Sequence, residues 1–380
     1  MPMLLIQGSF HLKDTQPDGD TVHFLADNVD DWSLVGGNNP VQLTGTDHAK
    51  LRLEGIDALE THYHGAHQPL KHGHAAAKEL LKWLGFTDVQ RDANETVTAS
   101  TPVSTPGYIL TRGADLHGRV IALVGRGTPP GTSGTDISVG VPELKKTANH
   151  HLASAGLVYP TFYRSLFKDL RDELTQVAQQ AQAAGKGLWP DDETTSGVKI
   201  TGLSSITDDA VILPKLFRRL VDYLKLNMAL TCFPAYLAGM EDLVTVLSTG
   251  ERFTDMHTLV EVTNGNTLRM THPADDLLFD EKLGDCLAAY ATPRLLDVRQ
   301  PTELGTADGR HSRLSSPNTQ ESDTSPFTTQ SSRSVPSRTK PIFSRTRADA
   351  TLRVSVSACT RFRSNVSNAH CSKARAASVA

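Results

Sequence analysis

The chain of 380 residues has only four cysteines, which stand far apart at Cys232, Cys286, Cys359 and Cys371. No two of them form a Cys-x-x-Cys pair, so a structural zinc site built from cysteines is not expected. A disulfide framework is equally unexpected, because such frameworks stabilise short secreted chains rather than chains of this length. We therefore predict buried or free thiols.

Long apolar runs are also missing, and nothing in the sequence is typical of a membrane-spanning helix. The start, from Met1 to Gln7, has neither the basic beginning nor the extended apolar stretch of a signal peptide. We interpret it instead as a first β-strand. Both absences predict a cytoplasmic protein that has no membrane partner.

The chain has no excess of positive charge, since its formal net charge at pH 7 is −4. Residues 301–380 nevertheless carry 12 Lys and Arg against 5 Asp and Glu, so the body that precedes them is acidic. An acidic body argues against broad, tight, sequence-independent binding of duplex nucleic acid. It does not exclude a nuclease, because the groove that faces the phosphates is local.

Residues 1–192 are predicted to form an α+β domain that combines a small β-barrel with helices. The turn Pro17-Asp18-Gly19 separates two β-rich runs and indicates a hairpin. Apolar residues at helical spacing predict helices over 74–84, 142–155 and 164–184. Gly85 is expected to end the first of these helices.

Two further regions follow this domain. Residues 198–298 are predicted to form a second ordered domain of small α/β type, with a helix over 214–230 and a hairpin turn at Asn264-Gly265. Because no chemistry-bearing constellation occurs there, its expected role is structural or protein-binding, with an unknown partner. Residues 300–380 are rich in Ser, Thr and Arg and poor in large apolar residues, which predicts a disordered basic tail.

Acids and arginines recur in three short stretches of the first region: DGDTV at 18–22, RLEGIDALE at 52–60 and HGR at 117–119. Each stretch alone is a weak signal, because Asp, Gly and Arg are common in ordinary surface turns. Together they supply oxygen ligands for a hard cation, a carboxylate that can accept a proton, and arginines that can hold phosphate oxygens. Metal-assisted cleavage of a phosphodiester needs these residue types.

In the order and spacing of these stretches, residues 1–192 resemble the staphylococcal nuclease (thermonuclease) family. The resemblance continues through NHHLASAGLVY at 149–159 and ends at GKGLW at 185–189. It implies an OB-fold β-barrel with packed helices. It also implies a metal-dependent phosphodiesterase of the endonuclease kind.

The resemblance assigns catalysis to Arg52, Glu60 and Arg119. By position, Glu60 matches the general base, and the two arginines match the residues that clamp the phosphate. This assignment agrees with the chemistry of the side chains, because a carboxylate can take a proton from water and a guanidinium can hold two oxygens.

The resemblance also implies a calcium site, which another divalent cation could fill. Asp20, Asp57 and the backbone carbonyl of Ala58 match the family's metal ligands, and Asp18 matches a nearby acid. Oxygen ligands of this kind suit calcium, which is a hard ion with flexible coordination.

Tyr159 and Tyr163 lie near positions where the family places tyrosines that stack on bases, and they are the expected substrate-binding residues. Stacking of this kind suits single strands.

The sequence departs from the family pattern at two places. Leu59 stands where the family often has Pro, and Leu116-His117 stands where it commonly has Lys-Tyr to help hold a terminal phosphate.

The expected function is therefore a calcium-dependent nuclease that hydrolyses DNA or RNA and prefers single strands. The alternative is a catalytically inactive nuclease-like module that binds nucleic acid or protein. The retained acids and arginines favour catalysis, whereas the acidic body and the altered Leu116-His117 favour the inactive module. A third hypothesis is a structural adaptor whose work lies in residues 198–298.

Overall fold

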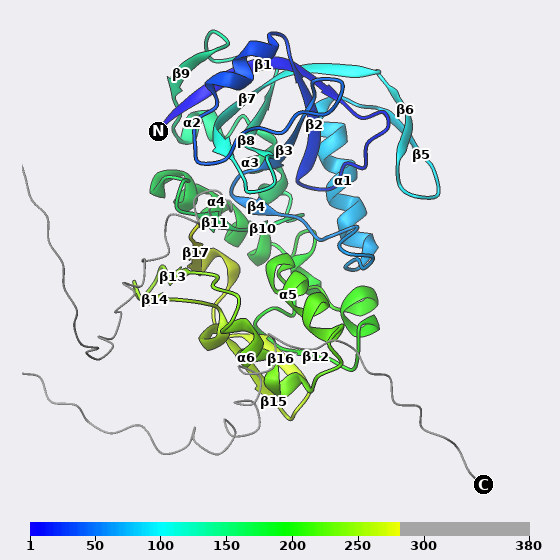
Figure 1. Cartoon of the computed structure of the whole chain (residues 1–380), viewed down its shortest axis with the longest axis vertical. Helices are drawn as coiled ribbons and strands as arrows, with labels where there is room; N and C mark the ends of the chain where they lie inside the picture. The colour runs from blue at the N-terminus through cyan, green and yellow to red at the C-terminus, as the bar shows by residue number, and fades with distance from the viewer. Residues whose placement is uncertain (282–380) are drawn as a thin grey trace, which may run out of the picture. The chain divides into compact units, whose positions relative to one another are not determined.

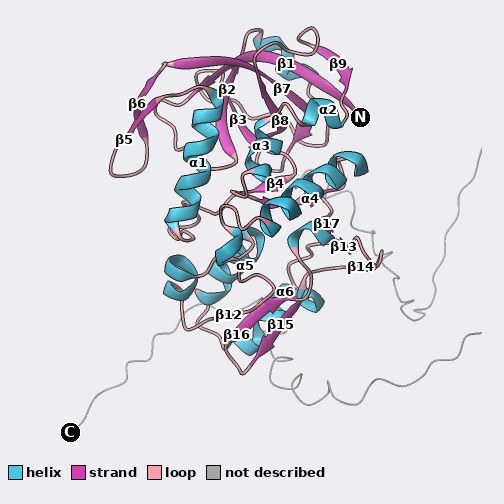
Figure 2. Cartoon of the chain, turned by 180° about the vertical axis from the view of Figure 1, so that it is seen from behind, coloured by secondary structure: helices cyan, strands magenta, loops and turns pink. Residues whose placement is uncertain are grey.

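The computed structural model of the chain describes residues 1–281. Its first part is a closed barrel of five strands accompanied by helices (Figure 1, Figure 2). The barrel strands are β1 (Pro2–His11), β2 (Thr21–Ala26), β3 (Ala49–Leu53), β7 (Ser104–Ala114) and β8 (Val120–Arg126). The predicted α+β class and β-barrel are confirmed.

The barrel closes because β1 pairs with both β2 and β7, while β8 connects β7 to β3. The β3–β8 pairing is parallel, and the other pairings around the barrel are antiparallel. The rings of Phe10 and Phe24 pack inside, with their centroids 5.0 Å apart. Gly8 and Gly107 face each other on β1 and β7, and a side chain at either position would collide with one of these rings. The two glycines thus make room for the aromatic core.

The predicted hairpin is confirmed, since β1 and β2 pair antiparallel on either side of the turn that contains Asp18 and Asp20. A Cβ atom at Gly19 would lie 2.5 Å from that of Ala58 and 2.6 Å from that of Ala76. The turn therefore approaches β4 (Ile56–Asp57) and α1 (Leu70–Leu84) very closely. This close approach brings the acids of the turn to the acids that follow β3.

Helix α1 begins earlier than predicted, directly after Pro69, and ends at Gly85, whose φ of 102° is the left-handed conformation expected of a terminating glycine. The single helix predicted over 142–155 is wrong. The chain forms two short helices there, α2 (Val141–Leu144) and α3 (Ala148–Ser154). Thr147 separates the two helices, because its backbone is extended and cannot continue α2. Its side chain accepts a hydrogen bond from the amide of His150 and so caps the start of α3.

Helix α4 (Lys168–Ala183) begins four residues after the predicted start at 164. Residues 164–167 form a turn instead. They come after strand β11 (Phe162–Tyr163), which follows β10 (Tyr159–Pro160). Strand β10 pairs with β4, so Tyr159 lies opposite Asp57. The outer strands of this part are β5 (Asp88–Arg91), β6 (Val97–Thr101) and β9 (Thr135–Ser138).

Residues 198–281 contain two helices, α5 (Pro214–Leu224) and α6 (Phe233–Leu237), and several short strands. These are β12 (Val198–Lys199), β13 (Val244–Val246), β14 (Arg252–Phe253), β15 (Val260–Thr263), β16 (Thr267–Met270) and β17 (Leu277–Phe279). The hairpin predicted around Asn264-Gly265 is confirmed by the pairing of β15 with β16. Helix α5 is shorter than the predicted 214–230, because turns follow Leu224 and Asn227 has a positive φ.

A second hydrophobic core, beside that of the barrel, connects residues 198–281 to the first part. It includes Leu59, Ala66 and Tyr159 together with the buried face of α5. Strand β11 also pairs in parallel with β17.

The predicted domain boundaries at residues 192 and 198 stay predictions. The predicted tail over 300–380 lies outside the described residues.

None of the helices within residues 1–281 is long and apolar enough to cross a membrane.

Candidate active site

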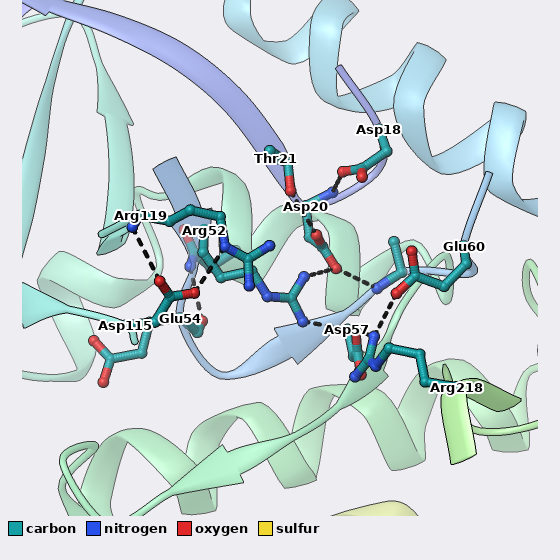
Figure 3. Close-up of polar contacts among 12 residues, drawn as sticks. Asp18, Asp20, Thr21, Arg52, Glu54, Asp57, Glu60, Asp115, Arg119 and Arg218 are labelled. Atoms are coloured by element: carbon teal, nitrogen blue, oxygen red, sulfur yellow. Dashed lines mark hydrogen bonds and ion pairs between the residues drawn. The ribbon is translucent and has the colours of Figure 1, made fainter. Parts of the chain in front are cut away.

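The predicted site residues come from neighbouring elements at one end of the barrel (Figure 3). Asp18 and Asp20 lie in the turn before β2, and Arg52 in β3 pairs across the sheet with Thr21. Asp57 ends β4, and the amide of Ala58 donates to Oδ2 of Asp20 at 2.7 Å. The predicted metal-binding acids are therefore brought together.

Arg52 lies between these two acids. Its guanidinium forms an ion pair with Asp20, and its Nη2 lies 2.6 Å from Oδ1 of Asp57. Burial alone would lower the pKa of Arg52, but the charges of Asp20 and Asp57 outweigh it and raise the pKa well above its usual value. Arg52 is thus a permanent positive charge at the centre of the site.

A second arginine, Arg218 of helix α5, enters the same cluster. Its Nη2 lies 2.9 Å from Oδ2 of Asp57, and its Nη1 lies 2.5 Å from Oε1 of Glu60 (Figure 3). Burial would raise the pKa of Asp57, yet Arg218 and Arg52 together hold it below its ordinary value. Sequence reasoning missed Arg218, because it follows Glu60 by 158 residues and no motif surrounds it.

The two remaining acids have raised pKa values. Burial raises the pKa of Glu60, and the opposing charge of Arg218 offsets this only in part. Burial, together with the charges of Asp20 and Glu60, raises the pKa of Asp18 to about 7. A carboxylate whose pKa moves toward neutrality is a better proton acceptor than one with an ordinary value. Glu60 therefore has the electrostatics expected of a general base.

Arg119 is held by Asp115, a residue that sequence reasoning did not single out. Nε of Arg119 donates to Oδ2 of Asp115 at 2.7 Å, while the amides of Arg119 and His117 donate to Oδ1 at 3.0 and 2.9 Å. Gly118 makes this tight turn possible with a φ of 73°. Asp115 and Arg119 stand four residues apart on either side of the turn at Gly118. This spacing could have indicated the pair in the sequence.

A pocket of about 630 Å³ opens over these residues. Arg52, Glu60 and Arg119 line it, together with Asp18 and Asp20. Residues 198–281 supply part of its wall, namely Lys215, Arg218, Arg219, Asp242 and Asp280. The pocket thus belongs to both parts of the described chain.

The two tyrosines predicted to contact substrate are placed differently. Tyr163 lines the pocket. Tyr159 is 1% exposed, its hydroxyl donates to Asp192 at 2.7 Å, and its ring packs against Trp189. Of these two predicted tyrosines, only Tyr163 lines the pocket, and Tyr63, which was not predicted, lines it too.

The predicted calcium ligands have suitable chemistry, since two carboxylates and a carbonyl suit a hard cation. Their arrangement does not fit one, however, because Asp20 is paired with Arg52, and Asp57 with both Arg52 and Arg218. Within residues 1–281, no group of three or more His, Cys, Asp or Glu side chains could hold a metal ion. Guanidinium groups thus neutralise the carboxylates to which the resemblance assigns the metal.

Glu54, on the pocket wall, is a further buried acid. Ser165 Oγ donates to its Oε1 at 3.2 Å, and burial raises the pKa of Glu54 from 4.5 to about 7. The folded protein thus binds this proton more tightly than the unfolded chain, so stability falls as the pH rises from about 4.5 to 7.

Replacing Glu54 by Gln is expected to remove the fall in stability between about pH 4.5 and 7. The variant should match the wild type below pH 4.5 and exceed its free energy of unfolding by roughly 3 kcal/mol above pH 7. Urea unfolding at several pH values measures the difference. Replacing the exposed Glu251 by Gln provides a control that should show no such trend. A pH-independent difference for Glu54→Gln would contradict the raised pKa.

A family model described as Staphylococcal nuclease homologue matches residues 50–191. The match includes Arg52, Asp57, Glu60 and Arg119, whereas the hairpin with Asp18 and Asp20 precedes it. That hairpin is nevertheless part of the same barrel, because β2 pairs with β3. Comparison with curated proteins gives no match.

Proposed function

We propose that the protein is a nuclease, because residues 50–191 match the Staphylococcal nuclease homologue family model and the site brings suitable side chains together. It would hydrolyse phosphodiester bonds of DNA or RNA. The observation that carries the proposal is that Glu60, Arg52 and Arg119 line one pocket. A base and two permanent positive charges then face the same bound phosphate.

In the proposed reaction, Glu60 accepts a proton from a water molecule as that water attacks phosphorus. The bond from phosphorus to the leaving oxygen breaks, and this oxygen takes up a proton from solvent water. Arg52 and Arg119 hold non-bridging oxygens and stabilise the charge that builds up in the transition state. Asp115 keeps the guanidinium of Arg119 oriented, because three donors of this turn converge on its carboxylate. Positioning and electrostatics thus supply most of the rate enhancement.

We further propose a preference for single strands. The pocket has walls from both parts of the described chain and contains the ring of Tyr163. An unpaired base can stack on such a ring, whereas a base inside a duplex would first have to leave its stack. Calcium dependence and a cytoplasmic location stay predictions.

One observation favours the alternative, a nuclease-like module without catalysis. Arg218 is paired with Glu60, the proposed base, and with Asp57. A base that accepts a hydrogen bond from a guanidinium is less able to take a proton from water. Such a module would bind nucleic acid and leave it intact.

Cleavage of labelled single-stranded DNA and RNA by the full chain distinguishes the two functions. The assay is run with calcium, with magnesium and with a chelator. We expect single strands to be cut under at least one of these three conditions. Intact substrate under all three conditions, with binding retained, would reject the nuclease and support the inactive module.

A further inference from the structure

We propose that Arg218 is a built-in cation of this site, which competes with a divalent metal ion for Asp57 and Glu60. Through it, helix α5 lowers the affinity of these carboxylates for a metal ion. The inference rests on the proposed nuclease function for its biological meaning, but the competition itself concerns binding alone.

The contacts of Arg218 are those of a specific clamp. Nη1 and Nη2 lie 3.3 and 2.9 Å from the two carboxylate oxygens of Asp57, and Nη1 also lies 2.5 Å from Oε1 of Glu60. Asp57 is 1% exposed. A guanidinium that bridges a buried carboxylate and its neighbour holds both far more firmly than a surface ion pair would.

Charge explains why a metal and Arg218 exclude each other. Asp20, Asp57 and Glu60 face Arg52 and Arg218, which leaves one negative charge of these three acids uncompensated. Without Arg218 the three acids would have two uncompensated charges, which a divalent cation could balance, and Asp18 beside Asp20 adds negative charge when it is ionised. Adding the cation while Arg218 stays would place three cations on Asp57, namely Arg52, Arg218 and the metal ion. Binding of a metal ion therefore requires Arg218 to leave.

Helix α5 holds Arg218 in place by contacts on several sides. Leu216, Phe217, Leu220 and Val221 are buried in the second core. Arg219 forms two hydrogen bonds with the buried Asp242, at 2.7 and 2.8 Å. One turn beyond Arg218, Asp222 accepts a hydrogen bond from the hydroxyl of Tyr63. The helix thus contacts both the acids and the loop that follows Glu60.

Calcium binding to the full chain tests the competition without any cleavage. Isothermal titration calorimetry compares the wild type with Arg218→Met, which keeps the length of the side chain and removes its charge. We expect the variant to bind calcium at least tenfold more tightly. Thermal unfolding should show the same difference, with a larger calcium-induced rise in Tm for the variant.

Two further variants separate competition from a general disturbance. Lys225→Met is the matched control, because it removes a positive charge at the end of α5 that donates to the carbonyl of His64 and not to a carboxylate of the site, and it should leave calcium affinity near that of the wild type. Asp222→Asn weakens the contact of α5 with Tyr63 and keeps all the site's carboxylates. It should increase calcium affinity by less than Arg218→Met does, and it serves as the test if Arg218→Met fails to fold.

Adding Asp57→Asn to Arg218→Met should abolish the gain in calcium affinity. That result would show that the ion binds at Asp57. Equal calcium affinities in the wild type, Arg218→Met and Asp222→Asn would overturn the proposal, as would the absence of calcium binding in both variants. A gain in affinity without cleavage of any substrate would reject the nuclease function and leave the competition standing. The two failures are therefore distinguishable.

Discussion

Replacing Glu60 by Gln is expected to slow cleavage by about 10²–10⁴-fold. The amide has nearly the same shape as the carboxylate but cannot accept a proton from water. Burial raises the pKa of Glu60, so the wild-type side chain is a stronger base than an ordinary surface glutamate. Single-turnover cleavage of labelled single-stranded DNA, with enzyme in excess, measures the chemical step directly.

Binding and folding need separate controls in this experiment. Affinity for the same DNA, measured by fluorescence anisotropy, should change little. Glu193 is a suitable comparison, because burial also raises its pKa but it is not among the residues that line the pocket. Glu193→Gln should cut at the wild-type rate. A Glu60→Gln protein that cuts as fast as the wild type would exclude Glu60 as the base.

Replacing Arg119 by Ala is expected to slow cleavage by about 10²–10³-fold, the cost of removing one preorganised donor to the transition state. The side chain of Arg119 is 32% exposed and lines the pocket, so its guanidinium can reach a phosphate there while Nε stays bonded to Asp115. Its removal also leaves the barrel core untouched. The same single-turnover assay measures the loss.

Two companion variants show whether geometry or charge matters at this position. Arg119→Lys keeps the charge but loses the planar fork, so it should restore little of the rate. Asp115→Asn removes the charged partner that orients Arg119 and should cause a smaller loss than Arg119→Ala. A full rate in Arg119→Ala would show that this arginine does not contact the reacting phosphate.

The barrel and most of the site could be predicted from the sequence because their signals are local. Arg52, Asp57 and Glu60 lie within nine residues, on β3, β4 and the loop after them. The turn with Asp18 and Asp20 joins two paired strands. Residues that are close in the sequence and lie on paired strands also lie close together in the folded barrel, so their spacing in the sequence predicts the site.

Helix boundaries were less predictable, as the segment around Thr147 shows. Apolar spacing over 142–155 fits one helix, yet the side chain of Thr147 caps a new helix in the middle of the pattern. The spacing of apolar residues predicts which face of a helix is buried. It does not predict a side-chain hydrogen bond to the backbone that ends one helix and begins another.

Arg218 could not have been found from the sequence. The amphipathic pattern predicted its helix, and the buried face of α5 is as expected. The pattern gives no information on which distant carboxylate a polar residue on that helix will meet. That depends on how the second core packs against Leu59 and Tyr159, which is a long-range property of the fold.

The pairing of β11 with β17 has a practical consequence for dissecting the protein. A fragment that ends at residue 192 would keep Phe162 and Tyr163 but lose the strand beside them. It would also expose more of Leu59, Ala66 and Tyr159 to water, because most of the core around them comes from residues 198–281. We therefore expect an excised barrel to aggregate more readily than the full chain.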